Sequence, residues 1–290
     1  EPLLALLETA PVGLFQIEAG LQSFHADTLA AVSRRTDMDK LCVHLRRLIA
    51  AGNLHVHIDL IAGLPRESLA CFAESFDRAY ALSPHMLQLG FLKLLHGTRL
   101  REDAAAHGYI YDARPPYELR SGHDLSEDDR VVLHQTEDAL ERLYNSGRFP
   151  RTLAYLLETT RLRPFELFRT FGAYAAERGH AGMSLDDYTA LVLTYFAALP
   201  AVEEQQLRNC LICDSLSTRA ALLPPCLRQT DSRLKRLKRR FAESGVRHGV
   251  ALLYAPERVA VATYSIPHPV TGQYPLEILP LPAEDENLLV

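Results

Sequence analysis

The chain has 290 residues, a net charge of -5 and 48% hydrophobic residues, so it is long enough for one large domain or two ordinary ones. The mild charge gives no sign of a global nucleic-acid or membrane surface, and no run of about eighteen apolar residues predicts a membrane-spanning helix. Five thinly spread cysteines do not form a disulfide framework, which indicates a reducing compartment, so we expect a cytoplasmic protein.

The first part of the chain alternates predicted helices and strands. In chain order we expect a helix over 3–8, a strand over 14–20, a helix over 26–50, a strand over 55–61, a helix over 68–82, a strand over 86–92 and a short helix over 97–108. Crossovers of more than about a dozen residues join parallel strands. The pattern therefore predicts an α/β fold whose three parallel strands do not close a barrel, with the remaining strands missing or supplied by another chain.

The central strand carries polar side chains at every second position. His55, His57 and Asp59 lie on one face, apolar residues lie on the other, and Gly63 and Pro65 end the strand. In α/β barrels and open α/β sheets the ligand sits at the carboxyl ends of the strands. We therefore predict that this strand end lines a binding site.

The second part is mainly helical. A helix over 125–144 begins at an N-cap, Ser126, with acidic residues in its first turn. Further helices are expected over 151–160, 164–178, 184–198, 201–216 and 231–244, followed by a β-hairpin of residues 249–254 and 258–266. We expect two domains: residues 1–115, a half barrel, and residues 116–290, a helical accessory domain with a small C-terminal sheet.

Three motifs in the first domain resemble one enzyme family. They are Ile-Glu-Ala-Gly-Leu-Gln-Ser-Phe at residues 17–24, Val-Ser-Arg at 32–34 and Asp-Leu-Ile-Ala-Gly-Leu-Pro at 59–65. Together they resemble the second half of the radical S-adenosylmethionine (SAM) core, closest to the oxygen-independent coproporphyrinogen oxidase type and to cobalamin-binding radical enzymes. Pro-Tyr-Glu at 116–118 and Tyr-Asn-Ser-Gly-Arg-Phe at 144–149 resemble the domain that follows this core in some cobalamin-binding members.

The resemblance implies a half-closed barrel of six parallel strands, of which strands four to six are present. It also implies that Gln22, Arg34 and Asp59 hold SAM. The chemistry agrees, because a guanidinium pairs with a carboxylate, and amide and carboxylate groups bond ribose oxygens. Ile61 and Gly63 would offer an apolar edge that allows close approach of adenine. Spacing alone does not separate Arg34 from Arg35.

One feature departs from the family. Its 4Fe-4S cluster needs the spacing Cys-x-x-x-Cys-x-x-Cys, and no such triplet exists in the 290 residues. We therefore expect the C-terminal portion of a longer enzyme, inactive alone, whose missing N-terminal half carries the cluster. The resemblance leaves open whether that half also carries a cobalamin domain. The parent would generate a 5′-deoxyadenosyl radical and act on an unknown substrate, and the isolated chain should bind SAM weakly at best.

Two other functions are compatible with the pattern. His55 and His57 could open the metal site of a barrel hydrolase, but the third strand offers only Gln88 and Gly90, or Leu87 and Leu89, where such a site needs further ligands. Alternatively, the chain is a non-catalytic interaction module in which the open edge of the strand over 14–20 pairs with another chain or a second copy.

Three further motifs can be explained either by a structural role or by a function. Cys210, Cys213 and Cys226 lack a clear fourth metal ligand, so buried thiols are favoured over an iron or zinc site. The basic helix over 233–240 is expected to have a solvated face rather than a nucleic-acid surface. Lys93 and His96, just past the third strand, are candidates for contact with the substrate.

Overall fold

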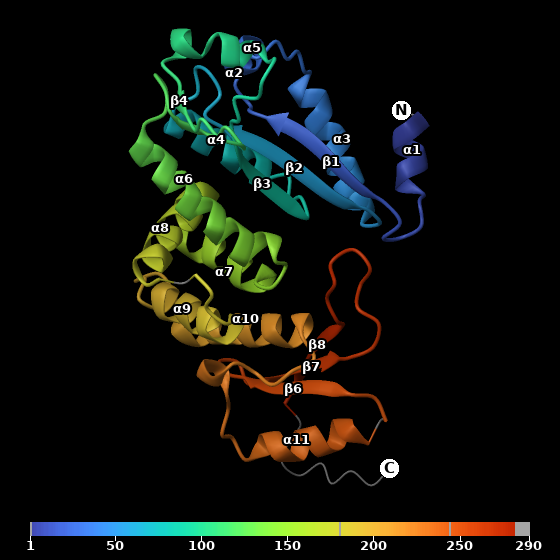
Figure 1. Cartoon of the computed structure of the whole chain (residues 1–290). Coiled ribbons are helices and arrows are strands. Elements are labelled where there is room, and N and C mark those ends of the chain that lie inside the picture. Colours follow the sequence, from blue (N-terminus) through green and yellow to red (C-terminus); the bar gives the residue numbers. More distant parts are fainter. Residues whose placement is uncertain (1, 180, 244, 282–290) are drawn as a thin grey trace. The chain divides into compact units, whose positions relative to one another are not determined.

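The computed structural model describes residues 2–179, 181–243 and 245–281 (Figure 1). These residues form two compact units. The first unit contains the residues up to Asn145 together with Leu162–Gly179, and the second contains Ser146–Arg161 and the residues from Ala181 onward. Within the described ranges, no helix has both the length and the apolar character needed to cross a membrane.

The first unit is built on a sheet of three parallel strands, as predicted. These are β1 (Gln16–Gln22), β2 (His55–Ala62) and β3 (Met86–Phe91), in the order β1-β2-β3. The first strand was expected over 14–20 and in fact runs two residues later. It continues to Gln22 because its pairing with β2 extends across a register shift between Gly20 and Gln22.

One face of this sheet is buried. Val56, Ile58 and Leu60 of β2 are fully buried, while the residues between them are only half-buried. The helices α3 (Met38–Ala51) and α4 (Leu69–Tyr80) contact β2. The alternation in the sequence thus matches a strand with one covered face and one partly open face.

The predicted helix over 26–50 is two helices. The first, α2 (Ala26–Ala31), stops before Ser33, which has a left-handed φ of 58°. The chain then restarts as α3, whose N-cap Asp37 accepts a hydrogen bond from the backbone nitrogen of Lys40 at 3.0 Å. Both parts share the same helical spacing, so the periodicity conceals the break. At the start of the chain, α1 (Pro2–Glu8) packs on α3.

Short elements between residues 99 and 121 lie beside the sheet's end. A single-turn helix, α5 (Arg99–Glu102), and a 3₁₀ turn at Ala104–His107 replace the helix expected over 97–108. The antiparallel pair β4 (Ile110–Tyr111) and β5 (Leu119–Ser121) was missed, because two or three residues are too short to show an alternating pattern.

The helices α6 (Glu127–Leu140) and α8 (Pro164–Glu177) belong to the first unit. Ser126 is the N-cap of α6, as predicted, and it also forms a capping box with Asp129. A π-helical turn at Glu141–Asn145 continues the helix. A Cβ at Gly172 would overlap the backbone of Gln135, so the two helices touch directly. The compact units therefore do not divide at residue 115, and the domains 1–115 and 116–290 stay a prediction.

The second unit combines helices with an antiparallel sheet. The helices are α7 (Pro150–Thr160), α9 (Leu185–Ala197), α10 (Glu204–Thr218) and α11 (Arg233–Ala242), with a 3₁₀ turn at Pro225–Leu227. The strands are β6 (His248–Leu253), β7 (Arg258–Thr263) and β8 (Leu276–Pro280), in the order β6-β7-β8. The predicted hairpin is β6 and β7. The strand β8 was missed because its five residues, Leu-Glu-Ile-Leu-Pro, show no regular alternation of apolar and polar side chains. The last residue of the predicted helix over 231–244 lies outside the described residues.

A buried carboxyl joins α10 to the start of α7. Asp214 is 1% exposed and accepts hydrogen bonds from the backbone nitrogens of Arg151 (3.1 Å) and Thr152 (2.9 Å) and from the Thr152 hydroxyl (2.7 Å). The first amides of a helix have no partner inside the helix, so Asp214 acts as its cap from another element. Burial raises the pKa of Asp214 to about 6, although these hydrogen bonds act in the opposite direction.

We expect the substitution Asp214→Ala to lower the free energy of unfolding by about 2 kcal/mol, because it leaves buried amide donors unpaired. Urea denaturation of the whole chain followed by circular dichroism measures this loss. The matched control is Glu158→Ala, which removes an exposed acid of α7 and should change stability by less than about 0.5 kcal/mol. Equal losses in the two variants would contradict the capping role.

Candidate functional site

The partly open face of the parallel sheet carries its polar side chains. The strand register sets Glu18 beside His57 and Gly20 beside Asp59, and Asp59 in turn lies beside Gln88 of β3. Paired positions of parallel strands share a face, so these groups lie on the same side as His55. The three ionisable residues of β2 therefore share one half-buried face, as the alternation predicts.

Gln22 ends β1 in an uncommon backbone conformation. Its φ is 69°, in the left-handed region that non-glycine residues rarely adopt, and the register with β2 shifts at this point. Its side-chain amide turns back over Gly20, where a Cβ would overlap Nε2 of Gln22. Oε1 of Gln22 is buried and has no hydrogen-bond partner among the described residues.

Arg34 reaches the same strand end from the segment after α2. Its Nη2 donates a hydrogen bond to the carbonyl oxygen of Gly20 and lies 3.9 Å from the position of a Cβ there. The neighbouring Arg35 is exposed. Arg34, rather than Arg35, is therefore the arginine at this site, and Gln22, Arg34 and Asp59 all meet around Gly20.

Asp59 faces another acid. Its side chain forms a hydrogen bond with the side chain of Glu18, while its Oδ1 is buried without a partner in the described part of the chain. Burial, followed by the hydrogen bond and the charge of Glu18, raises the pKa of Asp59 to about 6. Two negative charges this close repel each other, so the pair of carboxyl groups keeps one shared proton until the pH rises to about 6.

The histidines of β2 bond to each other. Nε2 of His57 lies 2.8 Å from Nδ1 of His55, and Nε2 of Gln16 lies 3.4 Å from Nδ1 of His57. The pKa of His55 is lowered by burial and by His57. The ring of His85 lies 5.0 Å from that of His55. Among the described residues, no group of three or more His, Cys, Asp or Glu side chains is arranged to hold a metal ion.

The two residues expected to flank adenine differ in their surroundings. Ile61 is half-buried on the same face as Asp59 and pairs with Gly90 of β3. Gly63 has a φ of 91°, and a Cβ there would meet the side chain of Leu119. The hydroxyl of Tyr109 donates to the carbonyl oxygen of Gly63 at 3.1 Å. The turn at Gly63 is therefore packed against residues of the 105–121 segment.

A buried polar cluster that the sequence did not indicate holds the neighbouring loops. Oε1 of Glu67 accepts hydrogen bonds from the hydroxyls of Ser23 (2.5 Å) and Ser75 (3.3 Å). The Ser75 hydroxyl in turn accepts from the backbone nitrogen of Phe24 at 3.0 Å. Glu67 is 1% exposed, and burial raises its pKa. The segment after Gln22 is therefore tied to the start of α4. The only signal in the sequence was an acid at a helix start, which is ordinarily exposed.

The remaining candidates lie elsewhere. Lys93 is exposed and forms an isolated antiparallel β-bridge with Glu118. The ring of His96 lies edge-on to that of Tyr117, with the ring centroids 4.9 Å apart. Neither residue lies on the strand face that carries Asp59.

The cysteines of the second unit are unpaired thiols. Burial raises the pKa of Cys210 to about 12 and that of Cys213 to about 11, and Cys226 also has a raised pKa. Thiols rather than thiolates are therefore present at neutral pH, which disfavours metal ligation.

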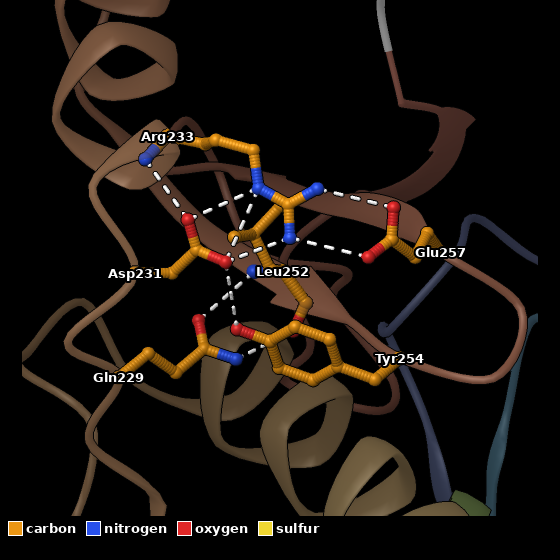
Figure 2. Close-up of polar contacts among 6 residues, drawn as sticks. All are labelled: Gln229, Asp231, Arg233, Leu252, Tyr254 and Glu257. Carbon is orange, nitrogen blue, oxygen red and sulfur yellow. Dashed lines mark hydrogen bonds and ion pairs between the residues drawn. The ribbon is translucent and has the colours of Figure 1, made fainter.

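The basic helix α11 rests on the C-terminal sheet. Leu234 and Leu237 are buried against residues of β6 and β7, while the cations between and after them are exposed. Arg233 is an exception, since its guanidinium pairs with Asp231 (2.7 Å) and Glu257 (3.1 Å) (Figure 2).

Comparisons with known proteins give two findings. Residues 105–248, just under half of the chain, match a family described as "Protein of unknown function (DUF4080)". The chain is also similar to the solved structure titled "Coproporphyrinogen III oxidase (HemN) from Escherichia coli is a Radical SAM enzyme", at 23% identity and a TM-score of 0.31. That similarity covers 43% of this chain and only 27% of the solved one, which is too limited to assign a function. No curated protein matches the chain.

The pH dependence of the acid pair is testable. We expect the Asp59 carboxyl carbon to titrate near pH 6 in a nuclear magnetic resonance experiment. Glu18→Gln should lower this pKa, because it removes the neighbouring negative charge. Asp59 binds its proton more tightly in the folded chain than in the unfolded chain, so protonated Asp59 adds to the free energy of unfolding. This contribution is complete below the ordinary pKa of 3.8 and is lost as the pH rises through about 6.

The control for this titration is Asp39→Asn, a substitution on α3. It should leave the pKa of Asp59 unchanged. A titration near pH 4 in the unmodified chain would rule out the buried acid pair.

Proposed function

We propose that this chain carries the cofactor-positioning strands of a radical SAM enzyme, with Gln22, Arg34 and Asp59 as the residues that hold SAM. The supporting observation is their meeting around Gly20, with Oε1 of Gln22 and Oδ1 of Asp59 buried and unpartnered among the described residues. Buried polar atoms ordinarily have partners, so unpaired ones at a strand end favour a ligand there. The sequence motifs that carry the resemblance contain these same residues.

Each residue suits one part of SAM. Arg34 uses one nitrogen for the Gly20 carbonyl, and its fork retains further donors for the methionine carboxylate. The amide of Gln22 can bond the carboxylate or ribose oxygens through its two kinds of polar atom. Asp59, ionised above pH 6, can accept hydrogen bonds from the ribose hydroxyls. Ile61 would then provide apolar contact for the base, and the packed turn at Gly63 would limit how closely it approaches.

The iron-sulfur cluster does not fit the residues of this chain. The spacing Cys-x-x-x-Cys-x-x-Cys is absent from the 290 residues, and the cysteines of the second unit are protonated thiols. When reduced by such a cluster, SAM supplies a 5′-deoxyadenosyl radical. We assign no redox step to this chain, and the proposal requires the cluster cysteines in a preceding segment. No described residue supports cobalamin binding.

The outer edge of β1 supports a further part of the proposal, the partial barrel. In the described residues β1 pairs only with β2. Exposed apolar side chains occur in α1 and in the segment that leads into β1: Leu3, Leu6, Val12, Leu14 and Phe15. A free edge beside exposed apolar residues is a template for pairing. We propose that further barrel strands, the N-terminal half of the same protein, cover it.

The SAM site can be tested on the chain as it stands. We expect millimolar SAM to shift the side-chain amide signals of Gln22 in a nitrogen-15 spectrum. Arg34→Ala should weaken this binding about tenfold, since it removes a charge-assisted contact. The matched control is Arg35→Ala, which should leave binding unchanged. Equal effects of the two substitutions would overturn the site, and tight binding without a cluster would overturn the claim that the site is incomplete.

The exposed edge of β1 also favours a second candidate, a non-catalytic module that pairs with another copy. We expect sedimentation at high concentration to reveal association of the chain, because the edge and its apolar residues are free to pair. Phe15→Lys should reduce the association, and Val131→Lys, at another exposed apolar residue, should not. A strict monomer would count against pairing between copies. No observation favours a hydrolase built on His55 and His57.

A further inference from the structure

The second unit contains a pocket of about 820 Å³ that the proposed function does not use. Its walls come from α11, from the first half of β6 and the residues just before it, and from the segments 221–223 and 228–229, with Leu216 of α10 and Tyr264. Its lining includes Leu222, Arg228, Lys238, Val246 and Arg247. The pocket therefore lies along one edge of the C-terminal sheet.

That edge is the unpaired side of β6. The sheet order is β6-β7-β8, so β6 has a neighbour on one side only. The backbone nitrogen of Tyr264 donates to the carbonyl of Arg247 at 2.9 Å, which makes this a hydrogen-bonded pair. Hydrogen-bonded pairs alternate along an antiparallel ladder. His248, Val250 and Leu252 consequently direct their backbone groups away from β7.

A side chain already imitates a neighbouring strand at one of these positions. The amide of Gln229 accepts from the backbone nitrogen of Leu252 at 2.9 Å and donates to its carbonyl at 2.6 Å, as Figure 2 shows. An added strand would make the same pair of hydrogen bonds, one to the backbone nitrogen and one to the carbonyl oxygen of Leu252. Gln229 thus protects the edge at Leu252, and the outward position next to it is Val250.

Val250 is the next outward position, and it lines the pocket. Among the described residues, no group outside the sheet bonds its backbone nitrogen or carbonyl. Buried backbone groups need partners, and an extended peptide supplies both a donor and an acceptor at the required spacing. The open edge therefore has the geometry for addition of a strand.

The side chains around the edge define what such a strand would carry. Arg228, Lys238 and Arg247 are exposed, and the described lining contains no acidic residue. Leu222 and Val246 are 75% and 44% exposed. The acidic side chains of an added strand would contact these cations, and its apolar side chains would contact the apolar part of the lining.

We propose that this pocket binds an extended segment of a partner protein, with alternating acidic and apolar residues, that pairs with the edge of β6 at Val250. Main-chain hydrogen bonds provide affinity, and the three cations select for acidic side chains. This binding is separate from the SAM site and does not depend on it.

Fluorescence anisotropy of the full chain tests the proposal with a peptide that carries fluorescein on its N-terminus, fluorescein-Glu-Val-Glu-Ile-Glu-Val-amide. We expect saturable binding that weakens as salt is added, and slower hydrogen exchange at the Val250 amide. Lys238→Glu should weaken binding about tenfold, since it reverses a charge in the pocket. Lys235→Glu is the matched control, because Lys235 is exposed on the same helix but does not line the pocket.

A second peptide separates strand addition from charge attraction. It has the same sequence with an N-methyl group on every backbone amide, so its charges are kept and its backbone hydrogen-bond donors are lost. We expect it not to bind. Equal binding of the two peptides, or equal weakening by Lys235→Glu and Lys238→Glu, would overturn the proposal, and so would the absence of binding by the first peptide.

Discussion

The close pairing of Gly20 with Asp59 is the constraint on which the candidate site depends. Because Gly20 has no side chain, the amide of Gln22 can fold back over it, and Arg34 can reach its carbonyl oxygen. Any larger residue would displace Gln22 from this place. The left-handed backbone at Gln22 follows from the same arrangement, since the chain must turn sharply after the bulge to bring the amide back. Backbone strain at Gln22 and the need for glycine at position 20 occur together at one strand end, which supports a functional role for this strand end.

Buried carboxyl groups fix the backbone in each unit. Glu67 ties the loop after β1 to α4 through Ser23 and Ser75, and Asp214 ties α10 to the first amides of α7. Burial raises the pKa of both acids, while their hydrogen bonds oppose the rise. A buried acid with several donors tolerates little movement, because each lost bond leaves a polar group without water. The loop that positions Gln22 is held in this way rather than by apolar packing alone.

The regular elements were predictable from sequence because their patterns are long. The alternation in His55–Ala62 gave a strand and its faces, and Ser126 with three acids gave the start of α6. Local pattern could not separate Arg34 from Arg35. That distinction comes from the left-handed turn at Ser33, which directs one arginine to Gly20. Contacts between residues far apart in the sequence could not be predicted from local pattern either.

Two contacts illustrate what a local pattern omits. The packing of Leu119 against Gly63 joins positions more than fifty residues apart, and the burial of Glu67 depends on serines from two other elements. Both contacts join residues that come together only in the folded chain, so neither produces a periodic pattern in the sequence. The small strands β4, β5 and β8 escaped for the related reason that short segments have little periodicity.

In the described residues β1 and β6 are edge strands of the two three-stranded sheets, and the residues beside these two edges differ in chemistry. The edge of β1 is accompanied by exposed apolar residues, including Leu14 and Phe15, which favour a permanent covering. The edge of β6 is accompanied by Arg228, Lys238 and Arg247. Like charges repel, so two copies of this edge would resist pairing with each other, as positive charge at natural sheet edges commonly ensures. The same charges attract an acidic strand, so one arrangement both prevents self-association through β6 and selects the partner.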